Sequence, residues 1–228
     1  MNPIHKIVRN VSSDKKVLKT LNTRQKIRFI FDYYRGYFFC FILLSMALLY
    51  IGEVVWQSHQ ETVLQGFFTN DRGGYFSAKA ITEDLSSYMN LKRGQQVILD
   101  DSLYVELGSS SEYITASQSK IVAYIAAQEL DFLVAGPDLT EYYMGNLSLY
   151  DLEALMGPDL SKELKDAVCY QKDKTGTLRA CGLDLSQSRF LKSADEPDGP
   201  YILMVPSTAP HPEAVAAFIR YSFGLPVH

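Results

Sequence analysis

The pattern of apolar and polar positions separates one long apolar run near the N-terminus from a stretch of short alternating segments. Between Tyr37 and Trp56 the chain has twenty residues with one charged side chain, Glu53. A helix of that length spans about 30 Å, the thickness of the hydrocarbon core of a bilayer. Tyrosines and one tryptophan flank the run, as is typical of membrane interfaces. The pattern therefore predicts a single transmembrane helix over residues 37–56.

Other interpretations of the apolar run are weaker. A buried core helix normally has a polar stripe, and residues 37–52 offer little beyond Ser45. A cleaved signal peptide has a shorter apolar core and small residues at its cleavage site, and nothing near Gly52 has that form. A lipoprotein anchor would need small residues before its cysteine, but Cys40 follows two phenylalanines. We therefore expect the helix to remain uncleaved.

The rest of the chain alternates strand-like and helix-like segments. Short apolar runs bounded by turn residues predict strands at 62–68, 97–99, 104–107, 132–135 and 201–205, with a turn at 100–102. Apolar positions at helical spacing predict helices at 76–89, 117–130, 138–144, 149–156 and 212–223, the fourth stopped by Gly157-Pro158. Residues 167–171 and 177–183 are expected to form a β-hairpin. The alternation predicts an α/β domain whose sheet carries helices on its faces.

Charge is distributed unevenly along the chain. Residues 1–36 carry nine Lys or Arg and two Asp, a net charge of +7, whereas residues 37–228 carry 13 Lys or Arg and 24 Asp or Glu, a net charge of −11. Basic flanks stay in the cytoplasm. We therefore expect a basic cytoplasmic segment (1–36), the transmembrane helix (37–56) and an extracytoplasmic α/β domain (57–228). The lipid bilayer is an expected partner, and nucleic acid is not, because the domain is acidic.

Two of the three cysteines, Cys169 and Cys181, lie on the arms of the expected hairpin. A three-residue loop at 174–176 with Gly last would place residue 171 opposite 179 and Cys169 opposite Cys181. Directly opposed residues have Cβ atoms about 4.5–5.5 Å apart, and thiols outside the cytoplasm can oxidise. The pair is therefore a candidate disulfide, with a matched pair of small apolar residues as the alternative. The C-x-x-C spacing that favours catalytic thiol chemistry is absent.

Sequence signatures of catalysis, metal binding and cofactor binding are missing. The four histidines are scattered, and no H-E-x-x-H, G-x-S-x-G, P-loop or G-x-G-x-x-G motif occurs. Asp100, Asp101 and Glu106 lack the spacing of a calcium loop. We therefore expect no enzyme activity, no metal site and no cofactor.

Four short segments carry a resemblance to known proteins. Residues 116–135 read A-S-Q-S-K-I-V-A-Y-I-A-A-Q-E-L-D-F-L-V-A, and residues 211–221 read H-P-E-A-V-A-A-F-I-R-Y. They resemble the K-x-x-A-x-I-A-A-G-E-L-D and x-P-E-A-A-x-x-F-I-x-F motifs of bacterial extracellular solute-binding proteins of the ABC-transporter type, with Gln128 where Gly is usual. Y-Y-R at 33–35 and C-G-L-D at 181–184 resemble motifs of uncharacterised single-span membrane proteins from Gram-positive anaerobes.

This resemblance implies a function and a fold. The chain would be a reduced, membrane-anchored relative of solute-binding proteins in the bacterial cell membrane, with a type 2 periplasmic-binding-like domain that includes the hairpin. It would bind a small solute without catalysis. The alternative function is a structural or interaction subunit of a permease or envelope complex, with no small-molecule ligand.

Candidate binding residues follow from the expected sheet. In open α/β sheets a ligand lies beyond the carboxyl ends of the strands. That edge includes the loop after the 132–135 strand, so Gly136, Asp138 and the nearby Tyr142 are candidates, and the start of the next helix can accept an anionic group. Ser109 and Ser111, in the polar loop before the 117–130 helix, are further candidates. The alternative, that these residues only cap helices and form turns, stays open.

Overall fold

The computed structural model describes residues 36, 38–53, 60–172, 176–192, 197 and 199–226. The chain divides into two compact units, Met1–His59 and Gln60–His228. In the first unit, residues 38–53 are helical and their large apolar side chains are exposed. Among the described residues, no helix combines the length and the apolar character that crossing a membrane requires. The basic segment up to residue 35, and residues 37 and 54–56 of the expected transmembrane helix, lie outside the described residues.

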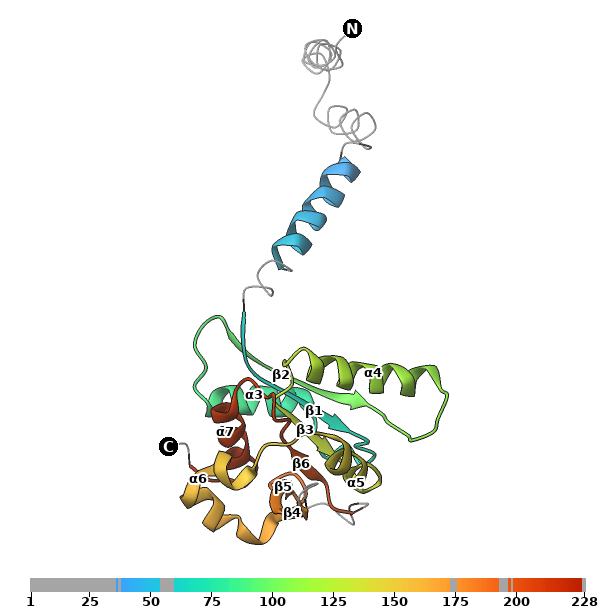
Figure 1. Cartoon of the computed structure of the whole chain (residues 1–228). Coiled ribbons are helices and arrows are strands. Elements are labelled where there is room, and N and C mark those ends of the chain that lie inside the picture. Colours follow the sequence, from blue (N-terminus) through green and yellow to red (C-terminus); the bar gives the residue numbers. More distant parts are fainter. Residues whose placement is uncertain are drawn as a thin grey trace, which may run out of the picture. The chain divides into compact units, whose positions relative to one another are not determined.

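The second unit is an α/β domain, as the sequence predicts, and it is built on a six-stranded mixed sheet (Figure 1). The strand order is β2-β1-β3-β6-β5-β4. β1 runs parallel to β2 and β3, whereas β6, β5 and β4 add as successive antiparallel neighbours. The strands are β1 (Glu61–Thr69), β2 (Gln95–Leu103), β3 (Phe132–Ala135), β4 (Val168–Lys172), β5 (Leu178–Asp184) and β6 (Ile202–Met204). The helices are α3 (Ala78–Tyr88), α4 (Glu112–Ala126), α5 (Pro137–Asn146), α6 (Leu152–Glu163), the 3-10 helix η1 (Lys165–Ala167) and α7 (Pro212–Ser222).

Helices pack on both faces of the sheet but cover them unequally. On one face, α3, α6 and α7 form the larger hydrophobic core, to which every strand contributes. On the other face, α4 and α5 form a smaller core with β1, β2, β3 and β6. Figure 1 shows these two groups of helices on opposite sides of the strands. The face of β4 and β5 that is opposite the larger core extends beyond the end of α5.

Aromatic side chains fill the centre of the larger core. Phe68 of β1 stacks on Phe76 with ring centroids 4.9 Å apart, and Phe132 of β3 stacks on Phe218 of α7 at 4.3 Å. All four rings are fully buried. β1 and β3 are central strands with helices on both faces, which explains why β3 is an unbroken apolar run and why β1 carries the adjacent apolar pairs Val63-Leu64 and Phe67-Phe68.

Most predicted elements are confirmed, with bounds within two residues. They are the strands at 62–68 (β1), 132–135 (β3) and 201–205 (β6), the helices at 76–89 (α3), 138–144 (α5) and 212–223 (α7), and the two arms of the hairpin (β4 and β5). α7 begins at Pro212, and Gly224 follows its end with φ 69°. Proline suits the first position of a helix, and glycine suits the left-handed conformation after the last turn.

The prediction of two strands separated by a turn at 100–102 was wrong, because β2 continues without interruption to Leu103 and residues 104–107 are not in a strand. Partners from elsewhere in the chain hold the two aspartates in the strand. The Lys120 ammonium of α4 pairs with Asp100, and the backbone N–H of Ala78 donates a hydrogen bond to Asp101 at 2.8 Å. Burial raises the pKa of Asp100, but hydrogen bonds from Lys120 and Ser102 outweigh it, so the pKa of this carboxyl is lowered.

Two helices also differ from the prediction. α4 begins at Glu112 rather than at 117 and ends at Ala126. α6 begins at Leu152 and continues past Gly157-Pro158 to Glu163. Gly157 adopts φ 73° and ψ 173°, a conformation open to glycine, and Pro158 then starts a second helical part after this kink. The glycine–proline pair therefore bends the helix instead of stopping it.

Candidate functional site

The carboxyl ends of β1 and β3 form the edge at which the sequence places a ligand. After β1 the chain forms β2 on one side of β1, and it later forms β3 on the other side. The loops that follow β1 and β3 therefore run in different directions, which is the position where open α/β sheets bind ligands. Asn70 follows β1 with φ 56°. Its side chain exchanges two hydrogen bonds with the backbone of Val105, at 2.7 and 2.8 Å. Gly136, which follows β3 at the same edge of the sheet, is the N-cap residue of α5.

A small cavity of about 50 Å³ lies between these loops, lined by Asn70, Arg72, Tyr201 and residues 136–138. The Arg72 guanidinium lies 2.8 Å from the Tyr104 hydroxyl and 3.3 Å from the Asp138 carboxylate. A space of this size holds ordered water rather than an organic solute. Asp138 already places a carboxylate in the first turn of α5, where a bound anion would be stabilised by the helix dipole. The edge is therefore closed by side chains of the chain itself.

Gly136 and Asp138 meet at this edge, but the other predicted binding residues lie elsewhere. Ser109 and Ser111 lie in the loop before α4, where the Ser111 N–H donates to Ser109 Oγ at 3.4 Å. Tyr142 is further along α5 and 43% exposed. None of these three residues lines the small cavity. Asn70 and Arg72, which do line it, were missed, although the N-D-R sequence directly after β1 signals a loop at this edge.

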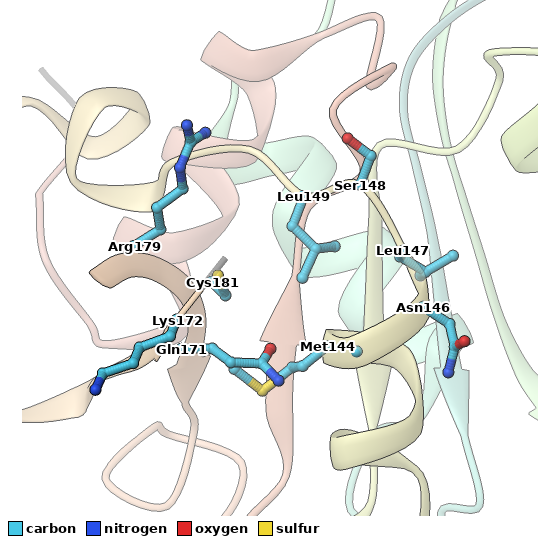
Figure 2. A pocket seen from close by; sticks show the side chains of 10 residues that line it. Met144, Asn146, Leu147, Ser148, Leu149, Gln171, Lys172, Arg179 and Cys181 are labelled. Atoms are coloured by element: carbon cyan, nitrogen blue, oxygen red, sulfur yellow. The ribbon is translucent and has the colours of Figure 1, made fainter. Parts of the chain in front are cut away.

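A much larger cavity, of about 520 Å³, lies at the other end of α5. One wall is residues 144–149, the end of α5 and the segment after it. The other wall is the β4–β5 hairpin, which contributes Gln171, Lys172, Arg179 and Cys181. Figure 2 shows these walls facing each other. We call this space the α5–hairpin cavity. Its volume is within the range of small-molecule sites in proteins.

The cavity exists because α5 ends before it reaches the hairpin. α5 packs against β3 and β6, and Leu147 at its end already has an extended conformation. Leu149 then pairs with Pro206, just after β6. From there the chain enters α6, which belongs to the core on the opposite face. The second face of the hairpin therefore borders a cavity instead of a helix.

The two walls of the α5–hairpin cavity differ in chemistry. The α5 wall presents the apolar side chains of Met144, Leu147 and Leu149. The hairpin wall is polar and presents Gln171 and Arg179, whereas Lys172 occupies the next register position, on the face of β4 that carries Tyr170. None of the described lining residues is Asp, Glu or His.

Gln171 has an unusual place in the hairpin wall. It lies opposite Arg179 in the β4–β5 register. Its Oε1 atom is buried and accepts no hydrogen bond from any described residue. Buried polar side-chain atoms are hydrogen-bonded in the large majority of cases, so an orphaned carbonyl oxygen beside a cavity needs an explanation.

The predicted register, with Cys169 directly opposite Cys181, was wrong. Gln171 lies opposite Arg179 as expected, but a β-bulge then shifts the register, so that Cys169 lies opposite Gly182. Cys169 is a free thiol. Burial raises the pKa of this thiol, and the charge of Asp184 adds to the effect. The disulfide stays a prediction from the sequence, and Cys181 lies in the wall of the α5–hairpin cavity.

Comparison with models of known protein families gives no match to this chain, and comparison with curated proteins gives none either. In the part of the chain that the structure describes, no group of three or more His, Cys, Asp or Glu side chains is placed to hold a metal ion.

Proposed function

We propose that this chain is a membrane-anchored, extracytoplasmic binding domain that holds a small solute without transforming it, as a reduced relative of solute-binding proteins would. The observation that carries the proposal is the α5–hairpin cavity, with a volume of about 520 Å³, an apolar wall and an opposed polar wall. Ligand sites in proteins combine these features, because apolar surface supplies affinity and a few polar groups fix orientation.

The membrane anchor is supported by the apolar run 37–56 and the basic segment before it. The described part of this run, 38–53, is helical. Phe41, Leu43 and Leu49 on this helix are 67%, 66% and 75% exposed. A helix whose large apolar side chains are exposed to this extent is suited to a lipid environment. The positive-inside rule then places the second unit outside the cytoplasm.

The absence of catalysis is supported by the cavity lining. Ser148 and Cys181 are the nucleophile types present there. Both would need a neighbouring base, and the described lining residues include no His, Asp or Glu. The site is therefore suited to holding a solute and not to activating a nucleophile.

Cys181 provides a direct test, because it is the one cysteine in the cavity lining. The full chain with Cys40→Ser and Cys169→Ser keeps Cys181 as the single thiol, and its reaction with a fluorescent maleimide reports access to the cavity. Amino acids, short peptides, sugars and small organic anions serve as probes. We expect at least one probe to slow the labelling and to raise the unfolding temperature of the unlabelled chain. No protection and no temperature shift across the whole panel would overturn the proposal.

Modification of Cys181 also supplies a blocked form of the cavity. A chain whose Cys181 already carries a bulky maleimide should show no temperature shift with the active probe. The matched control carries the same label at Ser119→Cys, on the exposed side of α4, in a Cys181→Ser chain. This control should keep the shift, because the label lies outside the cavity.

The second candidate function, an interaction subunit of a permease or envelope complex, is favoured by one observation. The exposed residues of α4 between Tyr113 and Ala126 include no charged side chain, and Val122 among them is 66% exposed. Such a face suits contact with another protein. If Val122→Glu reduces the size of the detergent-extracted native complex while no probe binds the cavity, this second function replaces the first.

A further inference from the structure

The two edge strands of the sheet, β2 and β4, differ in how well they are protected from pairing with another strand (Figure 1). β4 has five residues, and one of them is the exposed, charged Lys172. Short length and charged side chains, lysine above all, are common means by which edge strands avoid pairing with other chains. β2 has nine residues, and its first five, 95–99, include no charged residue, proline or glycine. β2 is therefore the less protected edge.

Apolar side chains of β2 remain partly exposed at this edge. Val97 and Leu99 belong to the face of the larger core, where Val97 is buried and Leu99 packs at the margin. Ile98 points to the opposite face, is half-buried and is part of neither hydrophobic core. Among the described residues, no strand pairs with the outer side of β2. A long edge strand of this kind is a template for a further strand.

The sequence of β2 is complementary to itself in the antiparallel direction. Residues 95–101 read Q-Q-V-I-L-D-D, so that three apolar residues lie between two neutral amides and two carboxylates. Antiparallel pairing about a two-fold axis at Ile98 would set Ile98 opposite its own copy and Val97 opposite Leu99. Opposed residues in antiparallel strands share a face of the sheet, so apolar side chains would meet on both faces.

Charge favours the same arrangement. The two glutamines would lie opposite Asp100 and Asp101 of the other copy, and their amide N–H groups can donate to these carboxylates. A carboxylate accepts several hydrogen bonds, so the contacts that hold the two aspartates within the domain can remain. Lys92 and Arg93 precede the strand, and each basic start would lie beside the acidic end of the other copy. Parallel pairing in register would instead oppose identical aspartates, which is destabilising.

We propose that the outer edge of β2 is a self-association site, at which two copies of this chain pair their β2 strands antiparallel about Ile98 and join their sheets into one. Both copies contribute the same residues, as in any two-fold interface. The described lining residues of the α5–hairpin cavity include none from β2, so this association is separate from the proposed solute site.

Disulfide trapping tests the register. The full chain with Cys40→Ser, Cys169→Ser and Cys181→Ser receives Ile98→Cys as its single thiol. Directly opposed residues have Cβ atoms about 4.5–5.5 Å apart, so mild oxidation should link two copies through residue 98. Gln96→Cys is the matched control in the same strand, because residues 96 of the two copies would be about 14 Å apart along the strands. An equal yield of linked dimer from both variants would overturn the register.

Charge variants test the edge itself. Analytical ultracentrifugation of the full chain in detergent should show an equilibrium between monomer and dimer. Ile98→Lys sets like charges opposite each other and removes apolar contact, so it should weaken association at least about tenfold. Gln95→Lys, opposite Asp101, should strengthen association severalfold, and Gln95→Glu should weaken it severalfold. Val122→Lys, an apolar-to-lysine change on the exposed side of α4, is the control and should leave association unchanged.

The outcomes are distinct from those of the cavity experiments. A monomeric wild-type chain that gives no linked dimer through Ile98→Cys would overturn the proposal, as would a dimer that Ile98→Lys and both Gln95 variants leave unchanged. A dimer that only Val122→Lys dissociates would place the contact on α4 and also overturn pairing through β2. If Ile98→Lys lowers the unfolding temperature of the chain, the opposite effects expected of the two Gln95 variants decide, because that side chain is only half-buried.

Discussion

Asp131 and His211 are joined by two hydrogen bonds. The His211 backbone N–H donates to Asp131 Oδ1 at 2.8 Å, and the His211 Nδ1 lies 3.1 Å from Asp131 Oδ2. Asp131 is fully buried, and its Oδ2 also accepts the backbone N–H of Gln65 at 2.7 Å. One carboxylate therefore connects the middle of β1, the start of β3 and the N-terminus of α7, three segments far apart in the sequence.

Asp131→Ala should destabilise the domain strongly. The substitution removes the acceptor of the buried Gln65 N–H and of the half-buried His211 N–H, and each lost bond costs about 1–3 kcal/mol. We expect the free energy of unfolding to fall by about 3–5 kcal/mol, measured by denaturant titration of the full chain. Asp131→Asn, which keeps one acceptor oxygen, should cost less. Glu129→Gln removes an exposed carboxylate two residues away and is the control; a similar loss there would contradict the prediction.

Asn70 supports a second prediction, about the loop after β1. Its side chain makes two hydrogen bonds with Val105, and its backbone has φ 56°, which Asn and Gly tolerate better than other residues. Asn70→Gly should lower the unfolding free energy by about 1–3 kcal/mol through the lost bonds alone. Asn70→Ala should lower it by about 1 kcal/mol more, because alanine adds strain at positive φ. If Asn70→Gly and Asn70→Ala are equally stable, the positive φ of residue 70 adds nothing to the unfolding free energy lost by the alanine variant.

The sequence predicts the central sheet well because burial on both faces leaves a local signal. β1 and β3 are short apolar runs next to turn residues, and their strand character can be seen without knowing their neighbours. β2 was misjudged for the opposite reason. Asp100-Asp101-Ser102 looks like a turn, and the partners that hold it extended, Lys120 and Ala78, are about twenty residues away on each side. Such tertiary contacts leave no local pattern.

The larger cavity was beyond the reach of sequence analysis for a related reason. Its walls come from residues 144–149 and from a hairpin that ends near residue 181, and they face each other because β6, the last strand in sequence, lies between β3 and β5. No spacing along the chain encodes that insertion. The edge at Gly136–Asp138 was located correctly, since the general rule for α/β sheets points there, but Arg72 and Asp138 fill it.

Tyr143 supports a prediction about alkaline pH. Burial raises the pKa of its hydroxyl to about 12, with the neighbouring Tyr142 adding to the effect. The unfolded chain has the ordinary pKa of about 10, so it loses this proton first as pH rises. The stability contributed by the protonated hydroxyl is complete below pH 10 and is lost progressively toward pH 12. Tyr143→Phe should therefore lose less unfolding free energy than the wild type over this range, by up to about 3 kcal/mol. Tyr113→Phe, which removes the hydroxyl of an exposed tyrosine on α4, is the control, and equal pH dependence of all three chains would contradict the prediction.

The β-bulge next to Cys169 leads to a prediction about the reactivity of the cysteines. In the unreduced Cys40→Ser chain, unfolding should expose two thiols to a colorimetric reagent, because Cys169 lies opposite Gly182. In the folded chain, Cys169 should react much more slowly than Cys181 near neutral pH, since its raised pKa leaves less thiolate. Cys169→Ser and Cys181→Ser assign the two phases. If the two thiols appear only after reduction, Cys169 and Cys181 form the disulfide that the sequence predicts.

Gly66 in β1 is a position where the fold depends on the lack of a side chain. A Cβ atom there would lie 2.0 Å from Cζ of Phe132, the register partner on β3. Phe132 is fully buried and stacks on Phe218, so its ring has no free space to enter. Overpacking of this kind costs about 1–3 kcal/mol or more. We expect Gly66→Ala to lower the unfolding free energy of the full chain by at least that amount.

A double-mutant cycle identifies the cause of that loss. Phe132→Leu removes the part of the ring that a Cβ at residue 66 would contact, so Gly66→Ala should cost at least about 1 kcal/mol less in the Phe132→Leu chain than in the wild type. Gly145→Ala is the control, because a Cβ at Gly145 on the exposed side of α5 meets no atom within 4 Å. Alanine there should be neutral or slightly stabilising, since it favours the helix. Additive losses in the cycle would show that the backbone freedom of Gly66, and not the close approach of the Phe132 ring, determines the cost.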